Sequence, residues 1–191
     1  IVKNDNSLWA TGYNANDFLG VGVQGDIHTF MKIMDNVKSF SNYMIIKTDG
    51  TLWYMKKGSI IKIDDNVVKV SAGAGIMYIK SDNTLWGYGE NSRGAFGTGL
   101  KNEMYPVPKK LRDDVIDVYI SGLYSLIITT DNEVFISGVH YLPKPYTSPS
   151  YSFIKLADNV RAVSDGFYIT NENLLYAFGY SAQGALGVGD I

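Results

Sequence analysis

The chain has 191 residues, of which 46% are hydrophobic and 19% are charged, with a formal net charge of −2 and no Cys. This composition is that of a folded globular protein and excludes disulfides and thiolate metal sites. It also disfavours nucleic-acid binding, which needs clustered Lys and Arg, and no apolar run approaches the roughly 18 residues of a membrane-spanning helix.

A short signature returns five times along the chain: an acidic turn residue, then an aliphatic residue and an aromatic one. The copies are Asp5-Asn6-Ser7-Leu8-Trp9, Asp49-Gly50-Thr51-Leu52-Trp53, Asp82-Asn83-Thr84-Leu85-Trp86, Asp131-Asn132-Glu133-Val134-Phe135 and Glu172-Asn173-Leu174-Leu175-Tyr176. Their spacing of about 33 to 49 residues indicates a repeat architecture.

Two further segments precede four of these signatures. An acidic or amide pair followed by Val opens a short strand at Asp35-Asn36-Val37, Asp65-Asn66-Val67, Asp113-Asp114-Val115 and Asp158-Asn159-Val160. A β-branched and aromatic segment follows, as in Met44-Ile45-Ile46, and is predicted to be a buried strand. The Asp-Gly and Asp-Asn pairs then predict a two-residue hairpin turn with positive φ before the third strand.

Three of the five units continue into a glycine ladder, with Gly at offsets 0, 8 and 10. The glycines are Gly12, Gly20 and Gly22, then Gly89, Gly97 and Gly99, then Gly179, Gly187 and Gly189. We expect them to occupy positive-φ turns or close approaches, while an apolar residue at offset 7 plugs the loop into the core. The spacing matches neither glycine-rich phosphate-binding motif.

These elements predict an all-β fold without a helix over residues 67 to 89. The approximate units are 1–34, 35–63, 64–111, 112–156 and 157–191, and they form a single repeat domain. Units of three or four antiparallel strands suit the blades of a β-propeller better than the rungs of a solenoid. We expect about four blades with incomplete ends, either part of a longer propeller or closed by pairing of the terminal half-blades.

The segment from Ser81 to Gly99 resembles the repeat of the regulator-of-chromosome-condensation family, in which D-G-x-L-W-x-W-G precedes N-x-x-G-Q-L-G-x-G. The resemblance covers essentially the whole chain, although the second and fourth units lack the glycine ladder. It implies a β-propeller, usually of seven blades and roughly twice this length. The family's histidine ahead of the second strand is absent, and Gly75 and Tyr124 stand in its place in units three and four.

Members of this family imply different functions. The eukaryotic founder is a guanine-nucleotide exchange factor on chromatin, which this neutral-to-acidic chain does not resemble. Bacterial members include a secreted propeller that inhibits β-lactamases. We therefore predict a non-enzymatic protein-binding module of a bacterial surface or secreted protein, with the partner unidentified. The alternatives are an enzyme inhibitor of the β-lactamase-inhibitor kind and a carbohydrate-binding accessory module.

Residues capable of catalysis or metal binding are few. His28 and His140 have no matching acidic spacing, so no catalytic residue, metal site or cofactor is predicted. The recurrent Asp5, Asp49, Asp82 and Asp131 occupy equivalent turns, where an Asp side chain usually bonds its own backbone. The tryptophans of the signature are expected to pack rather than to stack on a ligand.

Two loops are rich in aromatic residues and are the candidate contact surfaces. The first runs from Tyr13 to Phe18, and the second, from Tyr141 to Tyr151, holds three of the five prolines. Proline favours extended, exposed backbone, and rigid aromatic side chains supply much of the energy at protein interfaces. The candidate binding residues are Tyr13, Phe18, Tyr141, Tyr146 and Tyr151. A replacement strand that only caps a degenerate blade is the alternative for the second loop.

Overall fold

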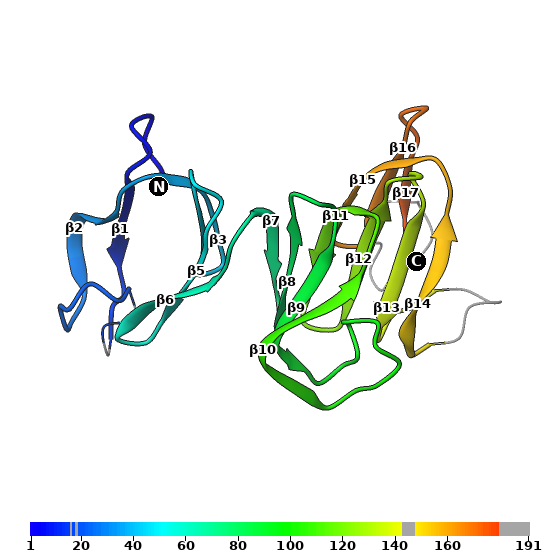
Figure 1. Ribbon diagram of the computed structural model, residues 1–191, viewed down its shortest axis with the longest axis horizontal. Helices are drawn as coiled ribbons and strands as arrows, with labels where there is room; N and C mark the ends of the chain where they lie inside the picture. Colours follow the sequence, from blue (N-terminus) through cyan, green and yellow to red (C-terminus); the bar gives the residue numbers. More distant parts are fainter. Residues whose placement is uncertain (16, 18, 143–147, 180–191) are drawn as a thin grey trace, which may run out of the picture. The chain divides into compact units, whose positions relative to one another are not determined.

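The computed structural model describes residues 1–15, 17, 19–142 and 148–179, and in these residues every regular element is a β-strand (Figure 1). The all-β prediction is confirmed, and residues 67 to 89 contain strands as expected. None of the described residues belongs to a helix long and apolar enough to cross a membrane.

The chain divides into two compact units, an N-terminal unit, Ile1–Val70, and a C-terminal unit, Ser71–Ile191. The strands of the N-terminal unit are β1 (Leu8–Gly12), β2 (Ile27–Met34), β3 (Val37–Ser41), β4 (Met44–Lys47), β5 (Leu52–Lys56) and β6 (Ser59–Asp64). Strand β7 (Val67–Ala72) spans the boundary. The remaining strands are β8 (Gly75–Lys80), β9 (Leu85–Asn91), β10 (Glu103–Arg112), β11 (Val115–Ile120), β12 (Tyr124–Thr129), β13 (Val134–Gly138), β14 (Ser150–Ala157), β15 (Val160–Ser164), β16 (Phe167–Thr170) and β17 (Leu175–Ala177).

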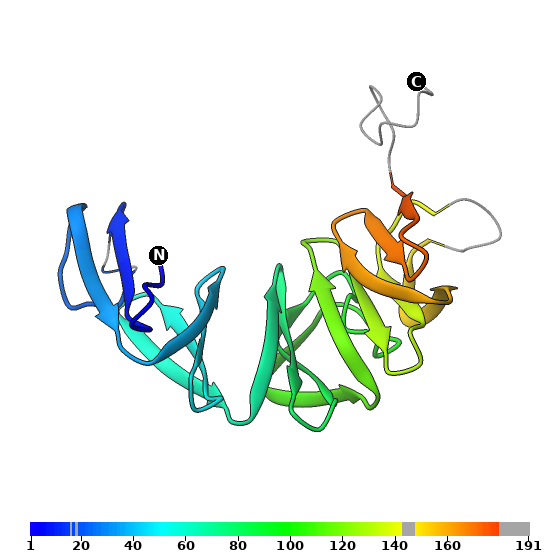
Figure 2. The same ribbon diagram turned by 90° about the horizontal axis from the view of Figure 1, so that it is seen from above.

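Each repeat forms one antiparallel sheet whose strands are neighbours in sequence (Figures 1 and 2). The four-stranded sheets are β3-β4-β5-β6, β7-β8-β9-β10 and β11-β12-β13-β14, flanked along the chain by the pair β1-β2 and the three strands β15-β16-β17. This meander is the blade of a β-propeller. In a four-stranded blade, β5, β9 and β13 are the third strands, and they pair on both sides.

The turn between the second and third strands differs from the predicted two-residue hairpin. In the second repeat, the N–H of Gly50 donates to the carbonyl of Lys47 at 3.0 Å, and the N–H of Lys47 donates to the carbonyl of Thr51 at 2.9 Å. This pattern closes a three-residue loop, in which only the last residue is left-handed. Gly50 has φ 81° and its equivalent Asn83 has φ 62°, whereas the preceding Asp residues do not have positive φ.

Successive repeats are joined by the same backbone hydrogen bond. The first-strand Val donates its N–H to the carbonyl of the left-handed turn residue in the preceding repeat, at 2.7 to 2.9 Å. The pairs are Val37 with Asn6, Val67 with Gly50, Val115 with Asn83 and Val160 with Asn132. All four valines are buried, with at most 1% of the side chain exposed. The polar pair before each Val is therefore a connection between repeats as well as a turn.

The aliphatic residue of each signature is covered by this connection. Leu8, Leu52, Leu85 and Val134 are at most 2% exposed, whereas Leu175 in the fifth repeat is 64% exposed. In the C-terminal unit, Leu85 shares a hydrophobic cluster with Val115 of the following repeat. No Val of a following repeat lies over Leu175 among the residues described.

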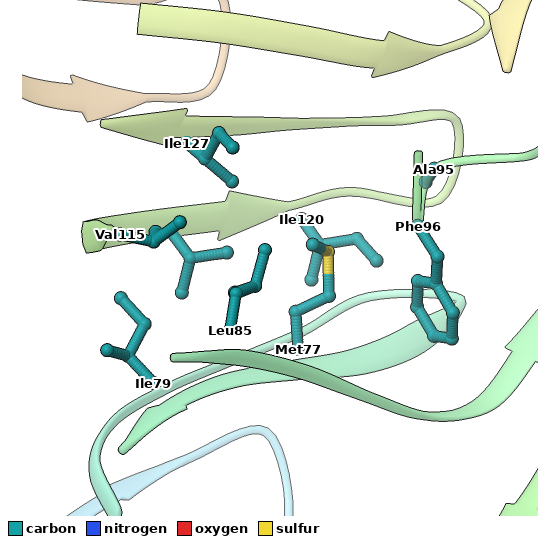
Figure 3. Packing of buried hydrophobic residues seen from close by; sticks show 9 residues of the cluster. Met77, Ile79, Leu85, Ala95, Phe96, Val115, Ile120 and Ile127 are labelled. Atoms are coloured by element: carbon teal, nitrogen blue, oxygen red, sulfur yellow. The ribbon is translucent and has the colours of Figure 1, made fainter. Parts of the chain in front are cut away.

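One hydrophobic cluster lies between the sheets β7–β10 and β11–β14. Figure 3 shows Met77, Leu85 and Ile79 pointing from β8 and β9 toward Val115, Ile120 and Ile127 of β11 and β12. Phe96, the residue at offset 7 of the second ladder, completes the cluster and is fully buried. Its ring has room because a Cβ at Gly75 or Gly87 would lie 2.6 and 2.9 Å from it.

Candidate functional site

The repeated Asp residues stabilise their own turns through a relay of side-chain hydrogen bonds. In the third repeat, the Asp82 carboxylate accepts the backbone N–H and the hydroxyl of Thr84, at 3.1 and 2.6 Å, and that hydroxyl accepts the indole N–H of Trp86 at 2.8 Å. The same relay joins Asp5, Ser7 and Trp9, and Asp49, Thr51 and Trp53.

These bonds favour the ionised carboxylates. The side-chain and backbone bonds from the residue two positions on lower the pKa values of Asp5, Asp49 and Asp82 below the usual 3.8. A Lys lies over each indole ring, with Lys3 Nζ 3.7 Å from the Trp9 centroid and Lys80 Nζ 4.6 Å from that of Trp86. In these three repeats the arrangement orients the Trp side chain and leaves the carboxylate hydrogen-bonded within the turn.

The fourth repeat has a different set of contacts at this turn. Glu133 replaces the hydroxyl residue, and its side chain forms an ion pair of 2.6 Å with Lys155. The aromatic position is Phe135, which has no N–H to donate, and the guanidinium of Arg112 lies 4.4 Å from its centroid. Asp131 therefore occupies the equivalent position without the relay seen at the other three Asp residues.

The described ladder glycines have the backbone angles that only Gly adopts easily. Gly12, Gly20, Gly22, Gly89, Gly97, Gly99 and Gly179 all have φ between 65° and 130°. Gly187 and Gly189 lie outside the described residues. The close approaches are specific: a Cβ at Gly97 would lie 2.3 Å from the Phe153 ring, whereas nothing lies near Gly89.

Both described ladders are filled by a buried Asn of their own. Asn91 accepts the N–H of Phe96 at 3.0 Å and donates to the carbonyl of Leu100 and the carboxylate of Glu103, each at 3.2 Å. Asn14 accepts the N–H of Leu19 and donates to the carbonyl of Val23 in the same way. In both ladders the Asn amide therefore ties the two sides of the loop together through backbone groups.

The two histidines have different surroundings. His28 is exposed on β2, whereas His140 is 1% exposed and neither of its ring nitrogens has a hydrogen-bond partner among the described residues. Burial lowers the pKa of His140, which favours its neutral form. Within the described ranges, no group of three or more His, Asp or Glu residues could hold a metal ion.

The candidate aromatic residues are only partly described. Tyr13 is 75% exposed in the N-terminal unit and Tyr141 is 58% exposed in the C-terminal unit. Tyr151 lies in strand β14 and is half-buried, because its ring packs within 2.4 Å of where a Cβ on Gly94 would stand. Phe18 and Tyr146 lie outside the described residues. Tyr13 and Tyr141 are therefore the predicted anchors with the most accessible rings.

Tyr124, at the position of the family's histidine, links the fourth and fifth repeats. Its hydroxyl donates to the Asp165 carboxylate at 2.6 Å and accepts the N–H of Gly166 at 2.8 Å. Burial and the Asp165 charge raise the pKa of Tyr124, so the phenol stays protonated. The sequence showed that a Tyr stands here, but the Asp partner is distant in sequence and could not be identified.

An apolar hollow in the N-terminal unit was not predicted from the sequence. It has a volume of about 280 Å³ and lies between the β1-β2 pair and strands β3 to β5. Its lining includes Leu8, Ala10, Leu19, Phe40, Tyr43 and Met55. Among the described residues that line it, none has a charged side chain. Leu8 and Met55 are buried, whereas Phe40 and Tyr43 are 43% and 44% exposed at its mouth.

Neither the scan against known protein families nor the search of curated proteins finds a match. Solved structures do match. Human WBSCR16 superposes with a TM-score of 0.74 at 16% identity, and Prp20p from Saccharomyces cerevisiae with 0.72 at 17% identity. Yeast RCC1 (Prp20) in complex with Kap60 gives 0.70 at 15% identity. The chain has an RCC1-like repeat fold.

The RCC1-like match extends over 94% to 97% of this chain but only 54% to 60% of the three solved chains. The chain thus spans little more than half the length of the RCC1-like structures it matches. The predicted resemblance is confirmed at the level of the repeat fold.

Proposed function

We propose that this RCC1-like chain is a non-enzymatic protein-binding module. Two similar structures support a protein partner, since Prp20p binds Gsp1p and histones, and yeast RCC1 (Prp20) forms a complex with Kap60. The described residues contain no metal-binding cluster, and the carboxylates of Asp5, Asp49 and Asp82 are hydrogen-bonded within their own turns.

The observation that carries the proposal is the exposure of aromatic rings on loops. Strand residues such as Leu126 and Ile136 are fully buried and serve packing, whereas the loop residues Tyr13 and Tyr141 are 75% and 58% exposed. A rigid ring that is exposed in the free protein supplies contact area at low entropic cost. Each loop is proposed as a contact surface in its own unit.

We further propose that this is a surface or secreted protein of a bacterium. The support is the likeness of the segment Leu85-Trp86-Gly87-Tyr88-Gly89-Glu90-Asn91 to bacterial members of the family, together with the absence of Cys. Inhibition of a β-lactamase is the narrower version of the same function. Binding to chromatin is not proposed, because a net charge of −2 provides no basic surface for DNA. Fractionation of the source cells with an antibody to this chain tests the setting, and a purely cytoplasmic pool contradicts it.

Photo-crosslinking from the two rings tests the protein-binding proposal. A photoreactive phenylalanine analogue replaces Tyr13 in one protein and Tyr141 in another, and irradiation is performed in extracts of the source organism. Val107, an apolar side chain that is 69% exposed on strand β10, is the matched control position. We expect a discrete crosslinked adduct from at least one of the two Tyr positions and no adduct from position 107.

The identified partner then allows an affinity measurement. Tyr13→Ala or Tyr141→Ala should weaken binding by about 1–2 kcal/mol or more, with the circular dichroism spectrum unchanged. A β-lactamase panel and a glycan array are screened in parallel. Adducts that are equally strong at all three positions, or binding to glycans alone, would contradict the proposal.

A further inference from the structure

The turn at Asp49 and Gly50 differs chemically from the equivalent turns of the other repeats. In the other four signatures the left-handed residue is Asn, with φ between 61° and 66°: Asn6, Asn83, Asn132 and Asn173. In the second repeat this residue is Gly50, with φ 81°. Because Gly has no side chain, its backbone nitrogen is the least hindered one that can follow an Asp. The nitrogen of Gly50 is therefore open to reaction with the neighbouring carboxyl group whenever the turn opens.

That reaction is the formation of isoaspartate, and it needs no reagent other than water. The backbone nitrogen of Gly50 attacks Cγ of the protonated Asp49 side chain and loses its proton, and one water molecule leaves. The product is a cyclic imide. Water then adds to one of its two carbonyl groups. Addition at Cγ restores Asp49, whereas addition at the main-chain carbonyl leaves the chain running through the side chain, one methylene group longer. No electrons are gained or lost.

The folded turn opposes the first step of this reaction. The N–H of Gly50 donates to the carbonyl of Lys47 at 3.0 Å, which directs it away from the carboxylate. The Asp49 carboxylate accepts the backbone N–H and the hydroxyl of Thr51, at 3.0 and 2.7 Å. These two bonds also lower the pKa of Asp49 and so reduce the protonated form that condenses. Asp49 is exposed, so water reaches it.

Modification at this turn would alter the connection between the second and third repeats. The carbonyl of Gly50 accepts the N–H of the buried Val67 at 2.8 Å, and the N–H of Thr48 donates to the carbonyl of Asn36, also at 2.8 Å. An extra methylene group between Asp49 and Gly50 shifts one of these groups relative to the other. Both bonds cannot then keep their geometry, and the N–H of Val67 loses its acceptor.

We propose that Asp49 is a site of isoaspartate formation that the folded turn suppresses, and that its modification breaks the Gly50–Val67 connection. The reaction proceeds through molecules in which the turn has opened, so its rate follows the population of the open turn. The inference goes beyond the proposed binding function and does not rest on it, because the site involves neither Tyr13 nor Tyr141.

The experiment compares the intact chain with a synthetic peptide of residues 45–55, which contains the turn without the fold. Both are incubated at mildly acidic pH and physiological temperature, and mass spectrometry of proteolytic fragments, with electron-transfer fragmentation, measures isoaspartate at position 49. We expect the peptide to accumulate isoaspartate at least about tenfold faster than the intact chain, because its turn is not held closed.

Two variants separate the roles of the hydroxyl and of Gly50. Thr51→Val removes the hydroxyl bond and should accelerate the reaction about fivefold in the chain, while the same change in the peptide leaves the rate unchanged. Gly50→Asn is the matched control. It introduces the residue of the other four turns, the nearest atom to its Cβ position lies 3.6 Å away, and it should nearly abolish the modification.

The consequence for the connection is measured on the modified chain after chromatographic separation. Hydrogen exchange at the N–H of Val67 should become faster, while that of Val37 stays unchanged. Thermal unfolding checks that each variant folds, and the comparison of chain with peptide uses only the unaltered sequence. Equal rates in chain and peptide, no acceleration in a folded Thr51→Val chain, or unchanged exchange at Val67 after modification would each overturn the proposal.

Discussion

The Met77 cluster of the C-terminal unit and the hollow of the N-terminal unit use the same positions of the repeat with opposite results. Leu85, Val115 and Ile127 are fully buried in one, and Leu8, Val37 and Ile45 are equally buried in the other. The backbone connection between repeats and the buried aliphatic residues beside it are thus present in both units. The difference lies further along the strands, where Met77 packs into the cluster of the C-terminal unit and a hollow of about 280 Å³ lies among the described residues of the N-terminal unit.

Small polar residues complete the closed interface. Ser125 and Ser137 are fully buried, and their hydroxyls donate to the carbonyls of Ala95 and Gly94 in the ladder. Their counterparts in the N-terminal unit are Tyr43 and Met55, which line the hollow instead. Successive repeats therefore share the backbone hydrogen bond of the first-strand Val. The size of the remaining side chains decides whether the space between the two sheets is filled.

Removal of the Phe96 ring should have the largest effect on this comparison. Phe96→Ala is expected to lower the free energy of unfolding by about 3–5 kcal/mol, because it empties a fully buried site. Leu19→Ala, its counterpart, should cost only about 1–2 kcal/mol, because Leu19 already borders open space. Urea unfolding measures both. Equal losses would show that the two interfaces are packed alike.

Gly75 tests how tightly the closed interface is fitted. A Cβ there would lie 2.2 Å from the carbonyl oxygen of Glu90 as well as against Phe96, so Gly75→Ala should destabilise the chain by about 3 kcal/mol. Gly122→Ala is the control, since nothing lies within 4 Å of its Cβ position. Thermal denaturation of the two variants gives the comparison. A Gly75→Ala protein as stable as its control would mean that β8 can move away from Phe96.

The Asp–hydroxyl–Trp relay is shared by the two regions and should contribute similarly in each. Thr84→Val and Ser7→Ala should each cost about 1–2 kcal/mol, because a hydroxyl that joins Asp to Trp is lost. A loss confined to one variant would mean that the relay is structural in only one unit.

The relay also predicts a pH dependence. The pKa of Asp82 is depressed below 3.8, so its stabilisation is present above that pH and disappears as the pH falls through the lower folded-state pKa. Thr84→Val should therefore flatten the decline in melting temperature below about pH 4. A decline identical to that of the unaltered chain would contradict this role of the hydroxyl.

The smallest expected effect is a gain in stability. Leu19→Phe places in the hollow the side chain that fills the equivalent position in the C-terminal unit. We expect an increase of about 0.5–1 kcal/mol in the free energy of unfolding, because the added ring covers apolar surface without a new polar group. A decrease would show that the hollow cannot accept a ring, and that the correspondence between Leu19 and Phe96 is incomplete.

The sequence predicted the strands and the repeat well because their signals are local. Val115, Leu85 and the ladder glycines recur at fixed offsets, and each reports a turn or a buried strand position. The detailed turn was missed, since Asp-Asn fits a two-residue loop and a three-residue loop alike, and only the hydrogen bonds of Lys47 distinguish them.

The candidate site was less predictable because it depends on contacts between distant segments. Aromatic content alone placed Tyr151 with Tyr13 and Tyr141, although Tyr151 lies on β14 against Gly94. The hollow is lined by Leu19 from the loop between β1 and β2 and by Phe40 from β3, and no single segment encodes how these residues come together. Alignment of the repeats by offset would have paired Phe40 with Val118, but burial was needed to show the difference.

Hydrogen exchange of the first-strand Val amides tests most directly whether the same connection joins the repeats in both units. The account predicts slow exchange for the N–H groups of Val37, Val67, Val115 and Val160, because each donates to the carbonyl of a turn residue in the preceding repeat. Rapid exchange at Val37 and Val67 with protection at Val115 and Val160 would contradict it.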